Sequence, residues 1–320
     1  MELRDARVVV TGGAGAIGSH VVDMLVAEGA YAVVFDCQPS GSVPVNLSDA
    51  LTTGRVELAW GDVRDAAAVE DVCQGADLVF HLAVARMDQC SAQPELAVDV
   101  NITGTFNVLQ AARAAGVQKV VYASAGAAYG EPRYVPVDEE HPLEPRGVYA
   151  ASKAAGEHLG AGFHAEHGLP FMALRFFNIY GPRHDHAGNR SQVIPSWLAC
   201  LEEGVPPRIF GDGTQTMDFV YITDAARAML LAARSDRCFG AYNVCRGVEI
   251  SAARLAEVMI CLMGSGLRPV FELGNGGHVR RRCGSPARAE AELGFRAAVG
   301  LEEGLRATID WRRRELCQAA

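Results

Sequence analysis

A run of β-branched residues leads directly into a glycine-rich turn near the start of the chain, and this junction constrains the fold more than any other feature. The run at 8–10 is typical of a buried strand. Gly12, Gly15 and Gly18 follow it and open an amphipathic helix. Glycines at this spacing permit a tight turn and let backbone N–H groups approach a phosphate at the positive end of the helix. The junction therefore predicts a strand–turn–helix unit that holds a pyrophosphate.

The first half of the chain repeats this alternation of short apolar runs and helical patterns. We expect strands at 7–11, 31–36, 56–60, 78–82 and 119–123. We expect helices at 16–29, 65–74, 93–116 and 147–167. Strands that read as continuous apolar runs, each followed by a helix, indicate a parallel sheet covered on both faces. The predicted fold class is α/β, with a doubly wound parallel sheet of the Rossmann type.

After residue 175 the alternation loosens, and Pro, Gly and charged residues cluster at 181–190 and 204–213. We therefore predict an NAD-binding Rossmann domain at 1–175 and a smaller α/β substrate lobe at 176–320, partly interleaved with the sheet. Two segments read as returning strands, at 171–177 and 241–244. Helices are expected at 192–203, 223–234, 251–263 and 301–315.

Composition excludes several other classes of protein. The net charge of -9 argues against a nucleic-acid partner, and no apolar run reaches the roughly 20 residues that span a membrane. We expect no signal peptide, because 8–10 enters a turn, and nine scattered cysteines fit reduced thiols in a cytoplasm. His184, Asp185 and His186 alternate in a loop without defined ligand geometry, so we predict no metal.

Asp36 ends the second predicted strand, about 20 residues beyond the glycines. A carboxylate there can accept hydrogen bonds from the hydroxyls of an adenosine ribose, and its charge repels a 2′-phosphate. No Arg or Lys lies within several residues of it. The pattern therefore favours NAD over NADP.

Tyr149 and Lys153 lie one helical turn apart, so they share one face of the helix predicted at 147–167. A phenol ionises near pH ~10, so it acts as a base near neutrality only when something stabilises the phenolate. A neighbouring ammonium and an oxidised nicotinamide would do so. The pair therefore predicts that Tyr149 takes a proton from a hydroxyl while hydride leaves the same carbon, with Lys153 stabilising the phenolate.

Together these motifs identify a family resemblance. The chain resembles the extended short-chain dehydrogenase/reductases, in particular the nucleotide-sugar epimerase/dehydratase group typified by UDP-glucose 4-epimerase, over nearly its whole length. The landmarks are Thr11-Gly12-x-x-Gly15-x-x-Gly18, Gly61-Asp62-Val63, His81-Leu82-Ala83, Asn101-x-x-Gly104-Thr105, Tyr129-Gly130, Tyr149-x-x-x-Lys153, Arg175-Phe176-Phe177-Asn178-x-Tyr180-Gly181-Pro182, and Gly211-Asp212-Gly213 followed by Asp218-Phe219-Val220.

The resemblance implies roles for residues that the spacing alone does not assign. It implies an NAD site formed by Gly12, Gly15, Ala16, Ile17, Asp36, Asp62, Val63, Leu82, Ala83, Arg86, Asn101, Tyr149, Lys153 and Phe176. Asp62 and Val63 would face the adenine, and Phe176 would lie near the nicotinamide. A nucleoside-diphosphate sugar would be bound by Asn178, Gln192, Arg183, Arg208 and Arg280.

The chain departs from the family pattern where the reacting hydroxyl is bound. The family places Ser or Thr four residues before the Tyr of Tyr129-Gly130, and that position here is Ala125. Either the adjacent Ser124 supplies the catalytic hydroxyl instead, or the donor is missing and the enzyme is weakened. The family's 4,6-dehydratases carry an Asp-Glu pair at the positions of Gly126 and Ala127, which argues against that dehydratase mechanism.

A second departure removes both cations expected on the substrate diphosphate. The family has Arg just before Asp-Phe-Val, where this chain has Met217, and a second Arg within 274–278, which reads Gly-Asn-Gly-Gly-His. Either other cations replace them or the substrate differs. The candidate replacements are Arg183, Arg190, Arg208, Arg280 and His278.

Three readings of function follow. The first is an NAD-dependent nucleotide-sugar epimerase, acting at C4 by transient hydride transfer. The second is an NAD-dependent sugar dehydrogenase, reductase or other dehydratase. The third is a catalytically inert NAD-binding regulator. Helices 93–116 and 147–167 are rich in Ala, Val and Leu and resemble the family's dimer interface, so we expect a homodimer in the cytoplasm.

Overall fold

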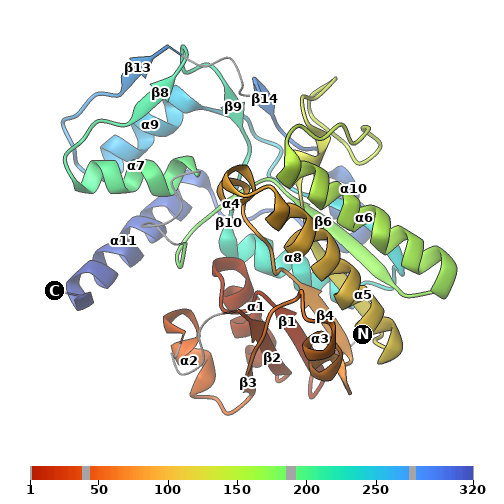
Figure 1. Ribbon diagram of the computed structural model, residues 1–320. Helices are drawn as coiled ribbons and strands as arrows, with labels where there is room; N and C mark the ends of the chain where they lie inside the picture. Colours follow the sequence, from red (N-terminus) through yellow and green to blue (C-terminus); the bar gives the residue numbers. More distant parts are fainter. Residues whose placement is uncertain (1, 38–43, 185–191, 274–278, 320) are drawn as a thin grey trace.

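A parallel sheet forms the centre of the computed structural model, which describes residues 2–37, 44–184, 192–273 and 279–319 (Figure 1). Within these residues the sheet has seven strands in the order β11-β6-β5-β4-β1-β2-β3, and every pairing between them is parallel. The strands are β1 (Arg7–Thr11), β2 (Tyr31–Asp36), β3 (Val56–Trp60), β4 (Leu78–His81), β5 (Lys119–Ala125), β6 (Phe171–Phe176) and β11 (Phe239–Val244).

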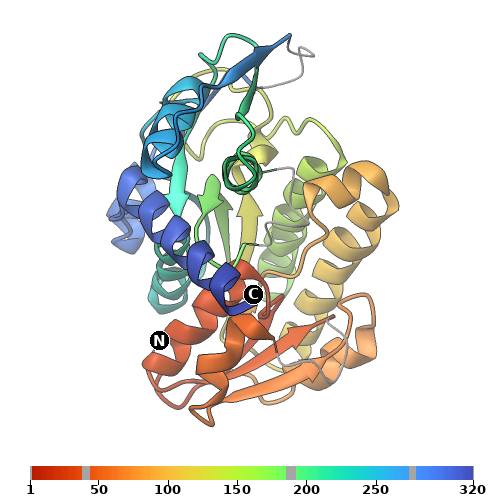
Figure 2. The same cartoon turned by 90° about the vertical axis from the view of Figure 1, so that its left-hand side faces the viewer.

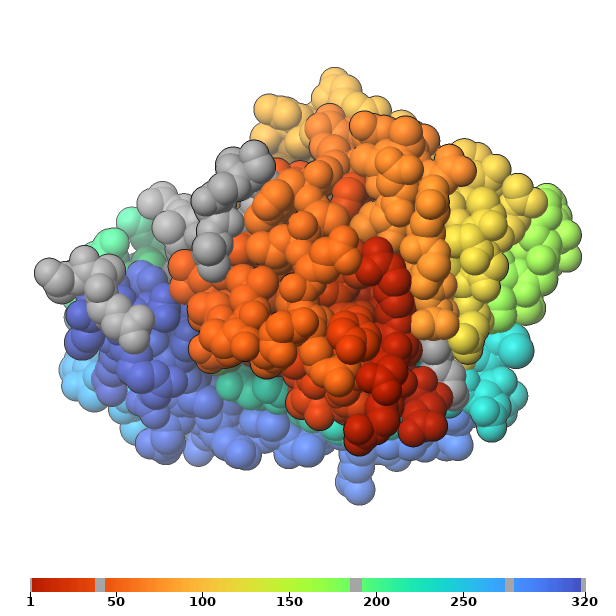
Figure 3. All heavy atoms as spheres, turned by 90° about the horizontal axis from the view of Figure 1, so that it is seen from below, coloured from red at the N-terminus to blue at the C-terminus, as the bar shows by residue number. Residues whose placement is uncertain are grey.

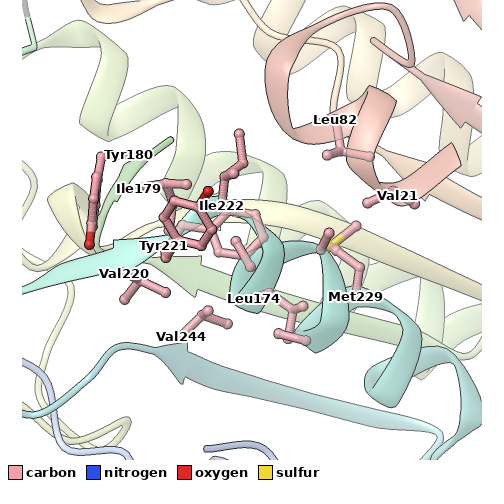
Figure 4. Close-up of a cluster of buried hydrophobic side chains, with 14 of the residues drawn as sticks. Val21, Leu82, Leu174, Ile179, Tyr180, Val220, Tyr221, Ile222, Met229 and Val244 are labelled. Carbon is pink, nitrogen blue, oxygen red and sulfur yellow. The ribbon is translucent and has the colours of Figure 1, made fainter. Parts of the chain in front are cut away.

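Alternate residues of these strands enter two hydrophobic cores, one on each face of the sheet. Val8 and Val10 of β1 enter one core and Val9 enters the other, because successive side chains of a strand point to opposite faces. Figure 4 shows part of the first core, where Val21, Leu174 and Met229 lie close together. Burial on both faces explains why the strands read as continuous apolar runs.

Helices cover both faces of the sheet (Figure 2). On one face α1 (Ala16–Ala27) packs against α8 (Ile222–Arg234). On the other face α5 (Gly104–Ala114) packs against α3 (Ala66–Cys73) and α6 (Val148–His167). The remaining elements of this part are η1 (Val45–Leu47), α2 (Ser48–Leu51), α4 (Met87–Ala92), the π-helical turn η2 (Ala97–Thr103) and η3 (Gly126–Tyr129).

A smaller lobe from the second half of the chain stands at one end of the sheet, at the top of Figure 1. Its strands are β7 (Asn178–Tyr180), β8 (Arg208–Phe210), β9 (Thr216–Met217), β10 (Phe219–Tyr221), β12 (Ile250–Ser251), β13 (Val270–Glu272) and β14 (Arg281–Arg282). The other helices of the second half of the chain are α7 (Val193–Glu202), α9 (Ala252–Leu262), α10 (Ala287–Leu293) and α11 (Leu301–Ala319). Figure 3 views the opposite end, where N-terminal residues in red and orange form the middle of the surface.

The predicted fold class is confirmed, and β11 shows that the second half contributes a strand to the sheet. Two expected elements are wrong in detail. The helix expected at 93–116 is divided into η2 and α5, because the backbone of 97–103 widens into a π-helical turn. The strand expected at 171–177 ends at Phe176, and the chain then pairs with β10 instead of continuing in the sheet. The domain boundary at 175 stays a prediction.

Candidate active site

The glycine turn lies at the carboxyl end of β1, where only glycine fits. Gly12 has φ +69, and a Cβ there would lie 2.8 Å from the backbone nitrogen of Ala83. A Cβ on Gly18 would lie 2.2 Å from the Gly12 carbonyl oxygen. Gly15 caps α1 in an extended conformation, and Ala16 and Ile17 form the first turn of the helix. The turn therefore presents bare backbone at a helix N-terminus, which is the arrangement that binds a pyrophosphate.

Asp36 lies beside this turn at the end of β2. Its carboxylate accepts hydrogen bonds from the backbone N–H of Ala14 at 3.0 Å and of Cys37 at 2.8 Å. Asp62 follows β3, and the ion pair with Arg64 at 2.6 Å holds the pKa of this carboxyl below its usual range. Arg64 is a cation that could attract the added phosphate of NADP, but Asp62 neutralises its charge.

The segment that follows β4 is held by buried polar contacts. The side chain of His81 lies between the hydroxyls of Thr11 and Thr105, at 2.7 and 2.9 Å, and burial lowers its pKa to about 3, so it is neutral. The Thr11 hydroxyl accepts from the N–H of Ala83 at 3.2 Å, next to the buried Leu82. Fixed backbone here gives the cofactor side of the site a rigid wall.

Asn101 joins this wall to the helix that carries the tyrosine–lysine pair. Its amide oxygen accepts from the N–H of Ala85 at 2.7 Å, and its amide nitrogen donates to Ser152 at 2.9 Å. Asn101 lies in the π-helical turn η2, a type of irregularity that is frequent at functional sites. Arg86 begins the nearby helix α4, where its guanidinium approaches Asp88 at 3.4 Å.

Tyr149 and Lys153 lie in the first two turns of α6, as predicted; Tyr149 is half-buried and Lys153 is buried. Tyr149 packs against Cys90 of α4, and burial raises its pKa to about 12. Lys153 is 3% exposed, and its Nζ lies 4.2 Å from the ring centre of Tyr122. Burial lowers the pKa of Lys153 to about 7, although nearby Glu157 opposes this shift.

The hydroxyl of Ser124 is engaged in a buried polar network below this pair. It donates to the carboxylate of Glu157, one turn beyond Lys153 on α6. Glu157 also accepts from Arg175 at 2.8 Å, and Arg175 donates to the hydroxyl of Tyr129 at 2.8 Å. The structure therefore places Ser124 in a supporting network, and its catalytic role stays a prediction.

The predicted cofactor residues gather at one edge of the sheet, since the carboxyl ends of parallel strands meet there. Gly12, Asp36 and Asp62 stand at or just after the ends of β1, β2 and β3. Val63 is buried beyond Asp62, and Phe176 ends β6 with 8% of its surface exposed. A family model now gives this geometry a name, since the NAD-dependent epimerase/dehydratase family matches residues 8–245. The chain belongs to this family.

Known relatives resemble the whole chain. A putative UDP-glucose 4-epimerase of Methanocaldococcus jannaschii is 34% identical over 95% of this chain and 97% of its own length. A dTDP-glucose 4,6-dehydratase of Streptomyces griseus is 31% identical over 95% of this chain and 93% of its own. The structure of a UDP-N-acetylglucosamine 4-epimerase of Methanobrevibacter ruminantium has a TM-score of 0.91 and 32% identity, covering 98% of this chain and 99% of its own. The chain therefore belongs to an NAD-dependent enzyme family, and its similar proteins include both epimerases and dehydratases.

The turn that follows β5 is tightly packed and carries few functional groups. A Cβ on Gly126 would lie 3.2 Å from the ring of Phe177, so a larger residue there would require this ring to move. Neither Gly126 nor Ala127 carries a carboxyl group, and Ala125, at the end of β5, has no hydroxyl. Positions 125–127 therefore offer only backbone and methyl groups.

The structure separates the predicted substrate residues. The side chain of Arg183 pairs with Asp23 of α1 at 2.6 Å. Arg208 and Glu272 approach to 3.5 Å across β8 and β13. Arg280 is exposed. Arg183 and Arg208 therefore each face a carboxylate, and Arg280 faces solvent.

The other predicted substrate residues lie nearer the sheet. Asn178 donates to the backbone carbonyl of Asp218 at 2.9 Å. Gln192 caps α7, and its amide oxygen is shielded without a hydrogen-bond partner among the described residues. Asp185, His186, Arg190 and His278 lie outside the residues that the structure describes.

The described residues contain neither a metal-binding cluster nor a membrane-spanning helix. No cluster of three or more His, Cys, Asp or Glu side chains is arranged to hold a metal ion in this part of the chain. None of the helices described here combines the length and apolar character needed to cross a membrane. Each of the nine cysteines, all of them described, is a free thiol.

Sequence reasoning missed Glu157, Arg175 and Phe177 as residues that shape the site. Arg175 stood inside a recognised landmark, and Glu157 stood one turn beyond Lys153, so a charged residue on the buried face of that helix was the available signal. The contact between Phe177 and Gly126 had no such signal, because it joins positions 51 residues apart that only the folded sheet brings together.

Proposed function

We propose that this protein is an NAD-dependent 4-epimerase of a nucleoside-diphosphate sugar. The observation that carries the proposal is the pair of half-buried Tyr149 and buried Lys153 on α6, at the same edge of the sheet as the glycine turn. The relatives named above as 4-epimerases support the choice of reaction. The proposed NAD contacts are those predicted from the sequence, from Gly12 to Phe176.

The chain's own residues would manage the proton of the sugar hydroxyl. NAD, when bound, supplies the hydride acceptor and a positive charge next to the pair. Tyr149, as the phenolate stabilised by these charges, would accept the proton of the C4 hydroxyl and would return it to the sugar's O4 when the hydride returns to the opposite face of C4. Lys153 would stabilise the phenolate of Tyr149 electrostatically. The negative charge of the phenolate would in turn raise the pKa of Lys153 above about 7.

The turn after β5 favours epimerisation over 4,6-dehydration. Dehydration needs an acid and a base beside the sugar, and Gly126 and Ala127 supply neither. The contact of Gly126 with Phe177 also leaves little room for a carboxylate. Ser124 is proposed as a positioning residue that holds Glu157, and through it α6, in place.

A homodimer in the cytoplasm is part of the proposal. Helical segments on one side expose large apolar side chains, including Val98 at 53%, Phe106 at 45% and Val148 at 44%. Exposed apolar groups on neighbouring helices are the usual material of an interface between subunits. Sedimentation of the purified protein as a monomer at all concentrations would refute the dimer.

The test is a panel of UDP-, dTDP-, GDP- and CDP-sugars incubated with the protein and NAD, with separation of the C4 epimers by chromatography. We expect one epimer pair to interconvert without net NADH. NADH formed in proportion to product would instead identify a dehydrogenase. Tyr149→Phe serves as the control, because it removes only the titrating hydroxyl.

A second candidate function has one specific observation in its favour. Ala125 lacks the hydroxyl, and the hydroxyl of Ser124 is taken by Glu157. A protein without this donor could bind NAD and sugar nucleotide as a regulator without turnover. NAD binding with no epimer formed from any sugar of the panel would favour this reading.

A further inference from the structure

We propose that Arg282 supplies the cation for the substrate diphosphate, in place of the arginine that the family carries at the position of Met217. The inference rests on the proposed function, because it assumes a nucleoside-diphosphate substrate. The proposed diphosphate contact lies on β14, whereas the family pattern places it on β9, at the position of Met217. Arg282 was not among the candidate replacements that the sequence suggested.

Strand register brings Arg282 beside Met217. β14 pairs with β9 in parallel, with Arg281 opposite Thr216 and Arg282 opposite Met217. Thr216 and Arg281 both bind Glu249, so they share one face of the pair. Since side chains alternate along a strand, Arg282 and Met217 share the other face. Neighbouring strands lie about 4.8 Å apart, a distance that an arginine side chain readily spans.

Arg282 is half-buried, and one of its guanidinium donors is unused. Its Nε is buried without a hydrogen-bond partner among the residues described, and no ion pair is formed by Arg282 within that set. Burial lowers its pKa, an effect that Glu131 opposes, and Glu131 itself approaches Arg146 at 3.7 Å. A buried donor without an acceptor is costly, and a phosphate oxygen would satisfy it. Arginine also matches phosphate with two parallel hydrogen bonds.

The strand that carries Arg282 leads into the wall of the candidate site. A Cβ on Gly284, two residues on, would lie 2.7 Å from the ring of Phe177, which also contacts Gly126. The N–H of Gly284 approaches the carboxylate of Asp218 at 3.4 Å, and the Asp218 carbonyl accepts from Asn178. Gly284, two residues from Arg282 along the chain, thus packs beside residues expected around the sugar.

The other arginines near these strands are occupied or exposed. Arg281 pairs with Glu249 at 2.5 Å and Arg208 with Glu272 at 3.5 Å. Arg183 pairs with Asp23 at 2.6 Å. Arg280 is exposed to solvent and next to the segment 274–278, which lies outside the description. Shielding combined with an unused donor distinguishes Arg282 from these four.

Calorimetry on the NAD-loaded protein tests the assignment. UDP, dTDP, GDP and CDP are titrated first, and the tightest diphosphate is carried forward together with its nucleoside. Arg282→Gln should weaken binding of the diphosphate about 10- to 100-fold and leave binding of the nucleoside unchanged. Arg281→Gln, on the opposite face of the same strand, is the matched control and should change neither by more than about twofold.

A relocated charge should rescue the loss. Adding Met217→Arg to Arg282→Gln should restore most of the diphosphate affinity, because it returns a guanidinium to the neighbouring strand on the same face. Arg282→Lys, which keeps the charge but loses the planar fork, should bind with intermediate affinity and serves if the Gln variant does not fold. Thermal melting with NAD identifies variants that are folded.

Three results would overturn the assignment. Equal diphosphate affinity of Arg282→Gln and the unchanged protein would show that Arg282 makes no contact. Equal loss for diphosphate and nucleoside would show a structural effect instead. Both results leave the proposed function standing. Failure of the unchanged protein to bind any of the four diphosphates would overturn both proposals together.

Discussion

The cofactor side and the substrate side of the candidate site follow different rules. On the cofactor side, Gly12, Gly18 and Asp36 match the family pattern, and the structure holds each in a position that backbone geometry defines. On the substrate side, Ala125 and Met217 stand where the family resemblance predicts a hydroxyl and a guanidinium. The sequence therefore matches the family pattern on the proposed NAD side and departs from it on the proposed substrate side.

The difference has a physical origin. A pyrophosphate cradle is made of backbone N–H groups and a helix end, and it fails if any side chain intrudes. A sugar diphosphate is held by long side chains, and a guanidinium can reach the same point from a neighbouring strand, as proposed for Arg282 and Met217. Substrate contacts can therefore move within the fold while cofactor contacts cannot.

The largest effect on turnover is expected at Tyr149, where the proposed cofactor and substrate sides meet. Tyr149→Phe should lower kcat on the confirmed substrate by about 10²- to 10⁴-fold, because it removes the group that transfers the proton. NAD affinity and melting temperature should stay close to those of the unchanged protein. Turnover by the purified Phe variant at an undiminished rate would remove the basis for the tyrosine mechanism.

The next effect concerns the network that supports both sides. Glu157→Gln leaves Arg175 as a buried cation without its carboxylate, so the free energy of unfolding should fall by about 3 kcal/mol in urea titrations. Glu166→Gln, on the exposed face near the end of the same helix, is the control and should change it by less than about 0.5 kcal/mol. Equal stability of the two variants would mean that the buried pair contributes nothing.

Asp36 tests the cofactor side through the choice between NAD and NADP. NAD should bind more tightly than NADP, and Asp36→Ala should narrow this gap about tenfold, because the carboxylate repels the added phosphate. Arg64 would pull in the other direction only if freed from Asp62, so Asp62→Asn should favour NADP slightly. Calorimetric titration with both cofactors gives the ratio, and equal wild-type affinities would refute the role of Asp36.

The smallest effect concerns the missing hydroxyl. Ala125→Ser should raise kcat/KM about five- to tenfold if it restores one hydrogen bond to the reacting oxygen. If Ser124 already donates that bond despite its contact with Glu157, Ser124→Ala should lower kcat/KM by a similar factor and Ala125→Ser should do little. If neither variant changes kcat/KM, this turn contributes no hydroxyl to the mechanism, and Tyr149 and Lys153 act without it.

The parts predictable from the sequence were those whose signal is local. The strands ending at Thr11, Asp36 and Trp60 lie at the bounds expected from their β-branched runs. Tyr149 and Lys153 could be paired in advance because two residues that lie four positions apart on a helix share one face. The glycine turn was equally local, since its spacing and the flanking strand and helix lie within one short segment.

The parts that escaped prediction depend on tertiary pairing. β9 and β14 are two residues each, too short to carry a period, so the register that sets Arg282 against Met217 could not be read from the chain. Ser124 was considered as a donor because the sequence does not reveal that Glu157, 33 positions later, binds its hydroxyl. Side-chain partners that are distant in sequence decided what local patterns left open.

The central claim is that hydride leaves C4 of a sugar nucleotide and returns to the same carbon. Sugar nucleotide labelled with deuterium at C4 tests it most directly, using the epimer pair found in the panel and mass spectrometry of the product. We expect the C4 epimer to keep the full label over many turnovers, without net NADH and without exchange with solvent. Loss of the label to water or to free NADH would contradict it.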